Sequence, residues 1–197
     1  KKNKRILLYL IQKEILIINK SLVNNLIKYS ESNCYYFYPE IKNYFDEKMK
    51  KKIESILSDY IPNNYELFER KRKIGENDST LCSIIRNDSV DDMISYCDKN
   101  NIKFSSLIKS SIFETNHYLI NKEPTLYEYA VFHGSINIIK YIKSSNIYIG
   151  PSILLYAVHS NKIEMINLLE KSIISDDVSY KKCLKKSIKC HHNQIAI

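Results

Sequence analysis

The sequence predicts an all-α protein built from repeated helical hairpins, and three observations lead to this prediction. First, the apolar pattern of residues 125–142 recurs in residues 152–169, a shift of 27 positions along the chain. Second, apolar residues in both segments are spaced by three and four, which is the spacing of an amphipathic helix. Third, the chain has only three glycines, four prolines and no tryptophan, which argues against an all-β chain with many tight turns.

The two copies agree at their apolar positions. The coinciding pairs are Tyr129 and Tyr156, Ala130 and Ala157, Val131 and Val158, Ile136 and Ile163, Ile138 and Met165, Ile139 and Ile166, Tyr141 and Leu168, and Ile142 and Leu169. Each copy therefore predicts two short helices joined by a turn. The turn falls on Gly134 in the first copy and Asn161 in the second, residue types that tolerate a left-handed backbone. Helices this short are unstable alone in water, so each hairpin needs neighbours.

The first copy also begins like a helical repeat. Thr125 and Glu128 have the spacing of a capping box, in which each side chain satisfies a backbone N–H of the first turn. The copy resembles the ankyrin repeat at eight positions, namely Thr125, Tyr129, Ala130, Val131, Gly134, Ile136, Ile138 and Ile139. It departs from the ankyrin pattern at Leu126, where proline is usual, and at Glu128, where histidine is usual. The offset is also shorter than the usual period of about 33, which predicts a shortened finger between units.

The resemblance is closer still to a divergent ankyrin family that carries a conserved block of uncharacterised role ahead of more regular repeats. The runs that carry it are residues 123–130, 111–116 and 75–79. This resemblance implies an ankyrin-like α-solenoid. It names a fold without naming a partner.

The N-terminal part, residues 1–74, is expected to be a separate helical region. Apolar spacing predicts one or two helices over residues 6–29, a break over residues 30–39, and a helix from about 41 to 60 that ends before Pro62. A shorter helix should follow around residues 65–72 and lead to Gly75. Residues 1–75 carry 16 Lys and Arg against 9 Asp and Glu, whereas the rest of the chain carries 14 against 13.

Residues 75–197 are expected to form the repeat domain. Asp78 and Ser79 are candidate caps for a degenerate two-helix unit over residues 79–96, and further helices are expected near 107–113 and 115–120. A third match, at an offset of about 30, places Cys183, Leu184, Ser187 and Ile188 in a first helix and the turn at residues 190–192. The chain ends inside the second helix of this unit, so the sequence has the appearance of a fragment.

Neither metal binding nor catalysis is favoured by the sequence. Cys183, Cys190, His191 and His192 are residue types that zinc prefers, but the repeat already accounts for them as helix-face and turn residues. No Asp or Glu is placed to pair with His133 or His159, and the three glycines are too far apart for a phosphate-binding loop. We therefore expect no enzyme activity, no cofactor and no small-molecule substrate.

Two basic clusters in the N-terminal region raise the alternative of nucleic-acid binding. They are Lys48, Lys50, Lys51 and Lys52, and Arg70, Lys71, Arg72 and Lys73, with aromatic residues nearby at 35–38. Positive charge gives attraction to phosphate but no base-reading motif. The aromatic run is equally explained as core between the first helices. We rank nucleic-acid binding second.

The favoured function is recognition of a partner protein by a concave helical face. The expected contact residues are Phe132, His133, His159 and Ser160 at the ends of the first helices, with Asn146 and Tyr148 in the finger. Five cysteines without a CxxC pair favour reduced thiols and a cytoplasmic location, with the nucleus left open. The apolar run 6–11 is too short to span a bilayer, so no membrane partner is expected.

Overall fold

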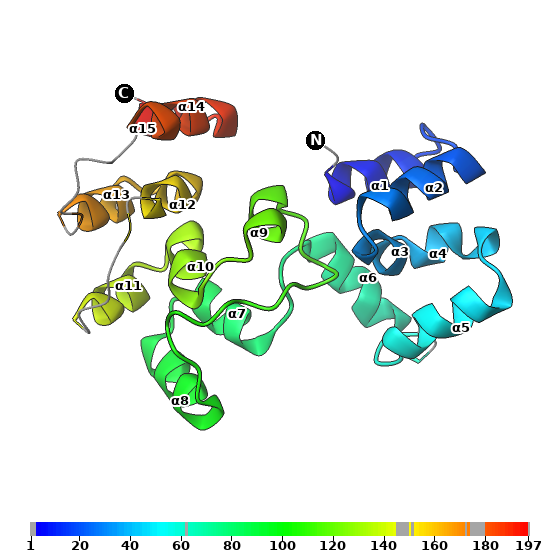
Figure 1. The fold of residues 1–197 in the computed structure, drawn as a ribbon, viewed down its shortest axis with the longest axis horizontal. Helices are drawn as coiled ribbons and strands as arrows, with labels where there is room; N and C mark the ends of the chain where they lie inside the picture. Colours follow the sequence, from blue (N-terminus) through cyan, green and yellow to red (C-terminus); the bar gives the residue numbers. More distant parts are fainter. Residues whose placement is uncertain are drawn as a thin grey trace. The chain divides into compact units, whose positions relative to one another are not determined.

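The computed structural model describes residues 3–61, 63–144, 150, 152–171, 173 and 180–196, and their regular structure is helical throughout (Figure 1). Among these residues there is no strand, and Leu107 and Thr125 form one isolated antiparallel bridge. The prediction of an all-α protein is confirmed. The chain packs as two compact units: the first contains Lys1–Asp78 and Ser110–Lys122, and the second contains Ser79–Lys109 and Glu123–Ile197. Residues 75–78 and 110–122, which we had assigned to the repeat domain, thus pack with the N-terminal helices.

The first unit consists of short helices around two clusters of buried side chains. Its elements are α1 (Lys4–Gln12), α2 (Lys20–Tyr29), α3 (Ser32–Tyr36), α4 (Tyr38–Ile41), the 3-10 helix η1 (Lys42–Tyr44), α5 (Glu47–Ile56), α6 (Tyr65–Ile74) and α9 (His117–Lys122). One or two helices were predicted within 6–29, and two are present; the helix predicted before Gly75 is confirmed.

Two predictions in this unit are wrong. The expected break at residues 30–39 holds α3 and the first half of α4, because Tyr36, Phe37 and Tyr38 are buried and their burial stabilises helices too short to form alone. The expected helix over 41–60 is shorter: it starts only after Asp46, whose side chain accepts from the Met49 N–H, and it ends at Ile56.

Residues 110–116 are joined to the first unit by hydrogen bonds to α6 and the residues after it. Gly75 ends α6 in a left-handed conformation (φ 72°), and its carbonyl accepts from the Thr115 N–H and hydroxyl at 3.1 and 2.8 Å. The Phe113 ring packs edge-on against Phe68 with centroids 5.5 Å apart. The helix predicted over 107–113 is wrong, because these backbone groups bond elsewhere: the Ile108 N–H donates to the Pro124 carbonyl instead of to a helical neighbour. Only α9 corresponds to the helix predicted at 115–120.

The described residues of the second unit form a row of four helical hairpins. They are α7 (Thr80–Arg86) with α8 (Val90–Asn100), α10 (Leu126–His133) with α11 (Ile136–Lys143), α12 (Ile153–Ser160) with α13 (Ile163–Glu170), and α14 (Tyr180–Cys190) with α15 (Asn193–Ala196). The first helices lie next to one another in the order α7, α10, α12, α14, and α8 lies against α11 (Figure 1). The duplicated hairpins at 125–142 and 152–169 are confirmed as like conformations, side by side. The capping box of Thr125 and Glu128 is present.

Each hairpin turns through one residue in the left-handed conformation. These residues are Asp88 (φ 55°), Gly134 (φ 71°), Asn161 (φ 55°) and His191 (φ 59°). Gly134 and Asn161 were expected from the sequence. Asp tolerates this conformation because its short polar side chain can bond locally, whereas His191 shows that the position in the repeat, more than the residue type, sets the turn.

In the last three hairpins, the residue after the left-handed residue reaches back to the preceding hairpin. Ser135 donates its hydroxyl to the Ile85 carbonyl at 2.7 Å, and Lys162 donates from Nζ to the Gly134 carbonyl at 2.6 Å. His192 Nδ1 lies 2.7 Å from the Val158 carbonyl. In each case the acceptor is at the C-terminal end of a first helix, where carbonyls lack helical partners. Different side chains thus perform the same joining role at three successive junctions.

Candidate interaction face

The C-terminal ends of the first helices carry a continuous line of aromatic, histidine and sulfur contacts, here called the helix-end row. Its members are Arg86 on α7, Tyr129, Phe132 and His133 on α10, His159 on α12 and Cys190 on α14. The row is connected by a 2.7 Å hydrogen bond from Arg86 Nη1 to the Tyr129 hydroxyl and by ring contacts from Tyr129 to His133 and from Phe132 to His159, with centroids 4.4 and 4.8 Å apart. His159 Nδ1 lies 3.7 Å from Cys190 Sγ. Repetition therefore brings together residues far apart in sequence.

The α10 part of this row is more buried than the sequence predicted. Phe132 is only 8% exposed, and His133 is partly buried with its Nε2 atom fully enclosed. Burial, with a smaller effect from the nearby Arg86 charge, lowers the pKa of His133 to about 4. The imidazole is therefore neutral near pH 7. The expected exposure of Phe132 as a contact residue is wrong, because it fills the space between neighbouring histidines.

The α12 part is partly accessible. His159 and Ser160 are both partly exposed at the end of α12, and the Nε2 atom of His159 is enclosed like that of His133. The Ser160 hydroxyl donates to the Ala157 carbonyl at 2.7 Å and accepts from the Lys162 N–H, which holds the side chain in one orientation. The predicted residues Phe132, His133 and His159 are thus brought together, and Ser160 follows directly. Asn146 and Tyr148 lie outside the described residues.

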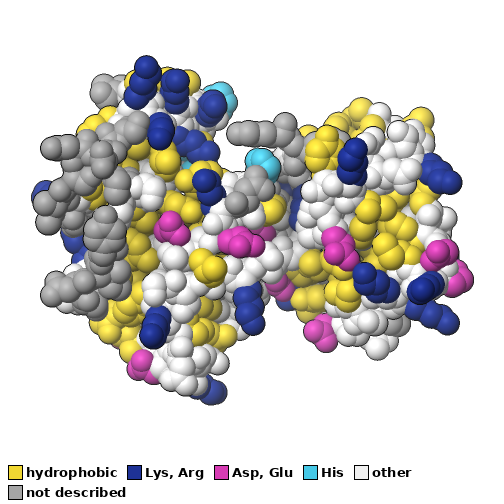
Figure 2. Space-filling model, viewed as in Figure 1, with side chains coloured by type: hydrophobic (Ala, Val, Ile, Leu, Met, Phe, Trp, Pro, Cys, Tyr) yellow, Lys and Arg dark blue, Asp and Glu magenta, His cyan; other side chains and the backbone are white. Residues whose placement is uncertain are grey.

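Sequence reasoning missed the basic surface of α14. This helix carries Lys181, Lys182, Lys185 and Lys189 as exposed residues, and Figure 2 shows lysine side chains gathered in this region. Between them Tyr180, Leu184 and Ile188 are 60%, 45% and 58% exposed, four residues apart along one face. The signal was present as a local density of lysines. The net charge of residues 76–197 does not reveal this density, because acidic residues elsewhere in that range offset the lysines of α14.

The cysteines and histidines of the last hairpin take part in packing. His192 bonds to the α12 carbonyl described above, and burial raises the pKa of the Cys183 thiol. None of the five cysteines, all of which lie in the described ranges, forms a disulfide, and Cys34, Cys82 and Cys97 are buried. Within the described part of the chain, no three His, Cys, Asp or Glu side chains come close enough together to hold a metal ion.

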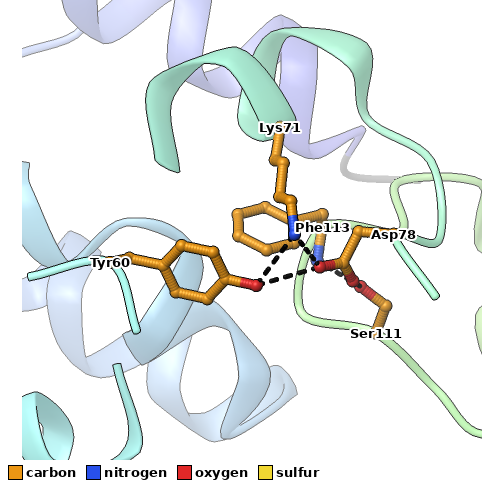
Figure 3. Close-up of polar contacts among 5 residues, drawn as sticks. All are labelled: Tyr60, Lys71, Asp78, Ser111 and Phe113. Atoms are coloured by element: carbon orange, nitrogen blue, oxygen red, sulfur yellow. Dashed lines mark hydrogen bonds and ion pairs between the residues drawn. The ribbon is translucent and has the colours of Figure 1, made fainter. Parts of the chain in front are cut away.

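Two members of the second basic cluster, Lys71 and Arg72, form hydrogen bonds and ion pairs within the first unit. Lys71 donates to Asp78 Oδ2 at 2.7 Å and to the Tyr60 hydroxyl at 3.1 Å, above the rings of Tyr60 and Phe113 (Figure 3). Ser111 donates to the other carboxylate oxygen of Asp78 at 2.7 Å. Hydrogen bonds from Lys71, Ser111 and Tyr60 outweigh burial and lower the pKa of Asp78.

Arg72 is completely buried between the rings of Tyr36 and Phe68. It donates to both carboxylate oxygens of Glu40 at 2.8 and 2.9 Å and to Glu69 at 2.6 Å. Neither Lys71 nor Arg72 is therefore placed to contact phosphate. The aromatic run at 36–38 is core, so these three rings are not placed to stack on bases.

Comparisons with known proteins add no relatives to this description. No protein-family model, curated protein or solved structure matches the chain. No helix in the described ranges is both long enough and apolar enough to cross a membrane.

Proposed function

We propose that the second unit is an ankyrin-like α-solenoid that recognises a partner protein through its first helices and their C-terminal ends. The observation that carries the proposal is the side-by-side order of α7, α10, α12 and α14, joined by equivalent bonds at each junction. Such an array fixes the relative positions of surface side chains before a partner arrives. Binding then avoids much of the entropy cost of ordering that surface.

The contact surface within this array runs from the end of α12 onto α14. Buried Phe132 packs against the His159 ring, whereas Ser160 and the exposed residues of α14 offer groups to a partner. The lysines of α14 favour an acidic protein segment, and Leu184 and Ile188 supply apolar contact area beside them. The lack of a disulfide among the five cysteines is consistent with a reducing compartment, and we infer a cytoplasmic partner on that ground.

Site-specific photo-crosslinking tests the proposal. A benzophenone amino acid is placed at Ser160 or Lys182 and, as matched controls, at the exposed positions Asn137 on α11 and Asn167 on α13. The chain is then irradiated in an extract of its source cells. We expect the same protein adduct from Ser160 and Lys182, and much less of it from the two controls. Equal yields from all four positions would contradict the proposed face.

Charge reversal on α14 tests separately whether its lysines contact an acidic partner. A Lys182→Glu, Lys185→Glu variant that carries the crosslinker at Ser160 should lose the adduct, because like charges would face the acidic partner. Lys99→Glu changes an exposed lysine on α8 and should leave capture unchanged. Nuclease treatment of the extract distinguishes direct binding of the partner from binding through RNA or DNA. An adduct that requires nucleic acid would disappear after this treatment at every crosslinker position.

A further inference from the structure

The first unit contains a cavity of about 360 Å³ that the proposed function does not use. Its lining is contributed by α1, α2, α3, α9 and the residues between them, and includes Lys4, Leu26, Ser30, Ser32, Phe37 and Ile120. Leu26 and Phe37 are buried at 2% and 0% exposure, whereas Tyr29 is 71% exposed. The cavity therefore has an apolar floor and an accessible rim, and its volume lies at the small end of ligand pockets.

One of the lining residues, Lys4, carries a buried ammonium group. Lys4 is only 8% exposed, yet its Nζ bonds to neutral acceptors: the Ser32 hydroxyl at 3.3 Å and the Ile112 carbonyl at 3.1 Å. It also lies 5.2 Å from the centre of the Tyr36 ring. Among the described residues no carboxylate forms a salt bridge with it. A buried cation without a counter-ion is costly, because burial removes water and nothing of opposite charge replaces it.

The nearest acidic influence on Lys4 is already engaged elsewhere. The Glu114 carboxylate accepts from the Asn77 N–H at 3.3 Å and the Asn116 N–H at 2.7 Å. Burial lowers the pKa of Lys4 to about 8, and Glu114 opposes this only in part. Lys4 thus keeps its charge near pH 7. Ser30 and Ser32, whose hydroxyl oxygens lie 2.9 Å apart, also line the cavity, and Ser32 is the hydroxyl that Lys4 contacts.

We propose that this cavity, the Lys4 pocket, binds a small organic acid whose carboxylate pairs with the Lys4 ammonium and whose apolar body lies along Leu26 and Ile120. The carboxylate supplies the missing counter-charge and accepts from the serine hydroxyls. The apolar body displaces water from the floor. Inorganic anions have no group to fill the floor, and neutral alcohols have no charge to pair, so each satisfies only half of the site.

Calorimetric titration of the full chain at pH 7 tests this assignment with octanoate, octan-1-ol and inorganic phosphate as probes. We expect octanoate to bind, with octanol much weaker and phosphate not detected. Lys4→Met keeps the apolar stem but removes the charge, and it should weaken octanoate binding by at least about tenfold, since hydrogen bonds to charged groups are the stronger class. Lys13→Met, an exposed lysine at the end of α1, should bind octanoate within about twofold of the unchanged chain.

A cavity-filling variant guards against a simple folding defect. Ile120→Trp leaves Lys4 in place and occupies the apolar floor, so it should also abolish octanoate binding, while circular dichroism shows whether each variant retains its helices. Equal octanoate affinity in the unchanged chain, Lys4→Met and Ile120→Trp would overturn the site. Absence of binding to the unchanged chain at millimolar octanoate would overturn it as well. Neither result bears on the interaction face of the second unit.

Discussion

Replacing Gly134 by alanine tests the inferred role of the turn in joining one hairpin to the next. Gly134 has φ 71°, and a Cβ at this position would lie 2.8 Å from Lys162 Cδ and 2.9 Å from Cε. The substitution therefore causes two separate losses. The backbone is held in a conformation unfavourable for alanine, and the Lys162 side chain must move away from the Gly134 carbonyl.

The size of the effect follows from these two losses. A left-handed conformation costs a residue with a Cβ about 1–2 kcal/mol. The Lys162 bond to the Gly134 carbonyl, at 2.6 Å, is partly exposed, so its loss should cost about 1–1.5 kcal/mol, near the lower limit for charged donors. Gly134→Ala should thus lower the free energy of unfolding by about 2–3.5 kcal/mol if the two losses add.

Urea denaturation followed by circular dichroism measures this change, and a double-mutant cycle separates its parts. In a Lys162→Met background the bond is already absent, so Gly134→Ala should cost only the conformational share of about 1–2 kcal/mol. Asn161→Gly is the control, because the same left-handed turn (φ 55°) then carries the residue that tolerates it best, and stability should be unchanged or slightly higher. Equal costs of Gly134→Ala in both backgrounds would refute the joining role of Lys162. A cost below about 0.5 kcal/mol, the size of an ordinary surface change, would refute the whole argument.

Three further substitutions probe other parts of the structure. The pKa of His133 is about 4 in the folded chain against 6.5 for the free side chain, so the unfolded chain binds more protons between these pH values. The free energy of unfolding should therefore fall by up to about 3 kcal/mol as the pH drops from 6.5 to 4. Denaturation curves of a His133→Phe chain that show the same decline would contradict this. Arg72→Ala leaves Glu40 and Glu69 without their partner and should cost about 3–5 kcal/mol in urea denaturation; a loss under 1 kcal/mol would mean that the ion pairs contribute little. Asp88 accepts hydrogen bonds from two N–H groups at the start of α11, both at 3.0 Å. Asp88→Gly should therefore lower the free energy of unfolding by about 1–2 kcal/mol, and Asp88→Asn should lower it clearly less. Equal denaturation midpoints for the two variants would contradict this order.

The repeat itself could be predicted from the sequence because its signal is local and occurs twice. Gly134 and Asn161 fall at the same place in two copies of one apolar pattern, and Thr125 with Glu128 forms a cap that spacing alone reveals. These features depend on residues within a few positions of one another. The structure places them as the pattern predicts.

The parts that were missed depend on long-range packing. Thr115 donates to the Gly75 carbonyl, 40 positions away, and this bond helps to fix residues 110–116 in a non-helical conformation. The apolar spacing of the sequence does not indicate such a contact. Phe132 occupies a position that sequence reasoning assigned to the surface, and it is buried because His159 of the next hairpin covers it. The Lys4 pocket requires segments more than 100 positions apart, so its ammonium looked like one of many surface lysines.

Hydrogen exchange of the full chain, measured with and without the partner captured by crosslinking, is the most direct test of recognition by the first helices. We expect slower exchange in α12, α14 and the turns that follow them. We expect no change in α11 and α13, the second helices. Protection confined to α11 and α13, or to the helices of the first unit, would contradict the account.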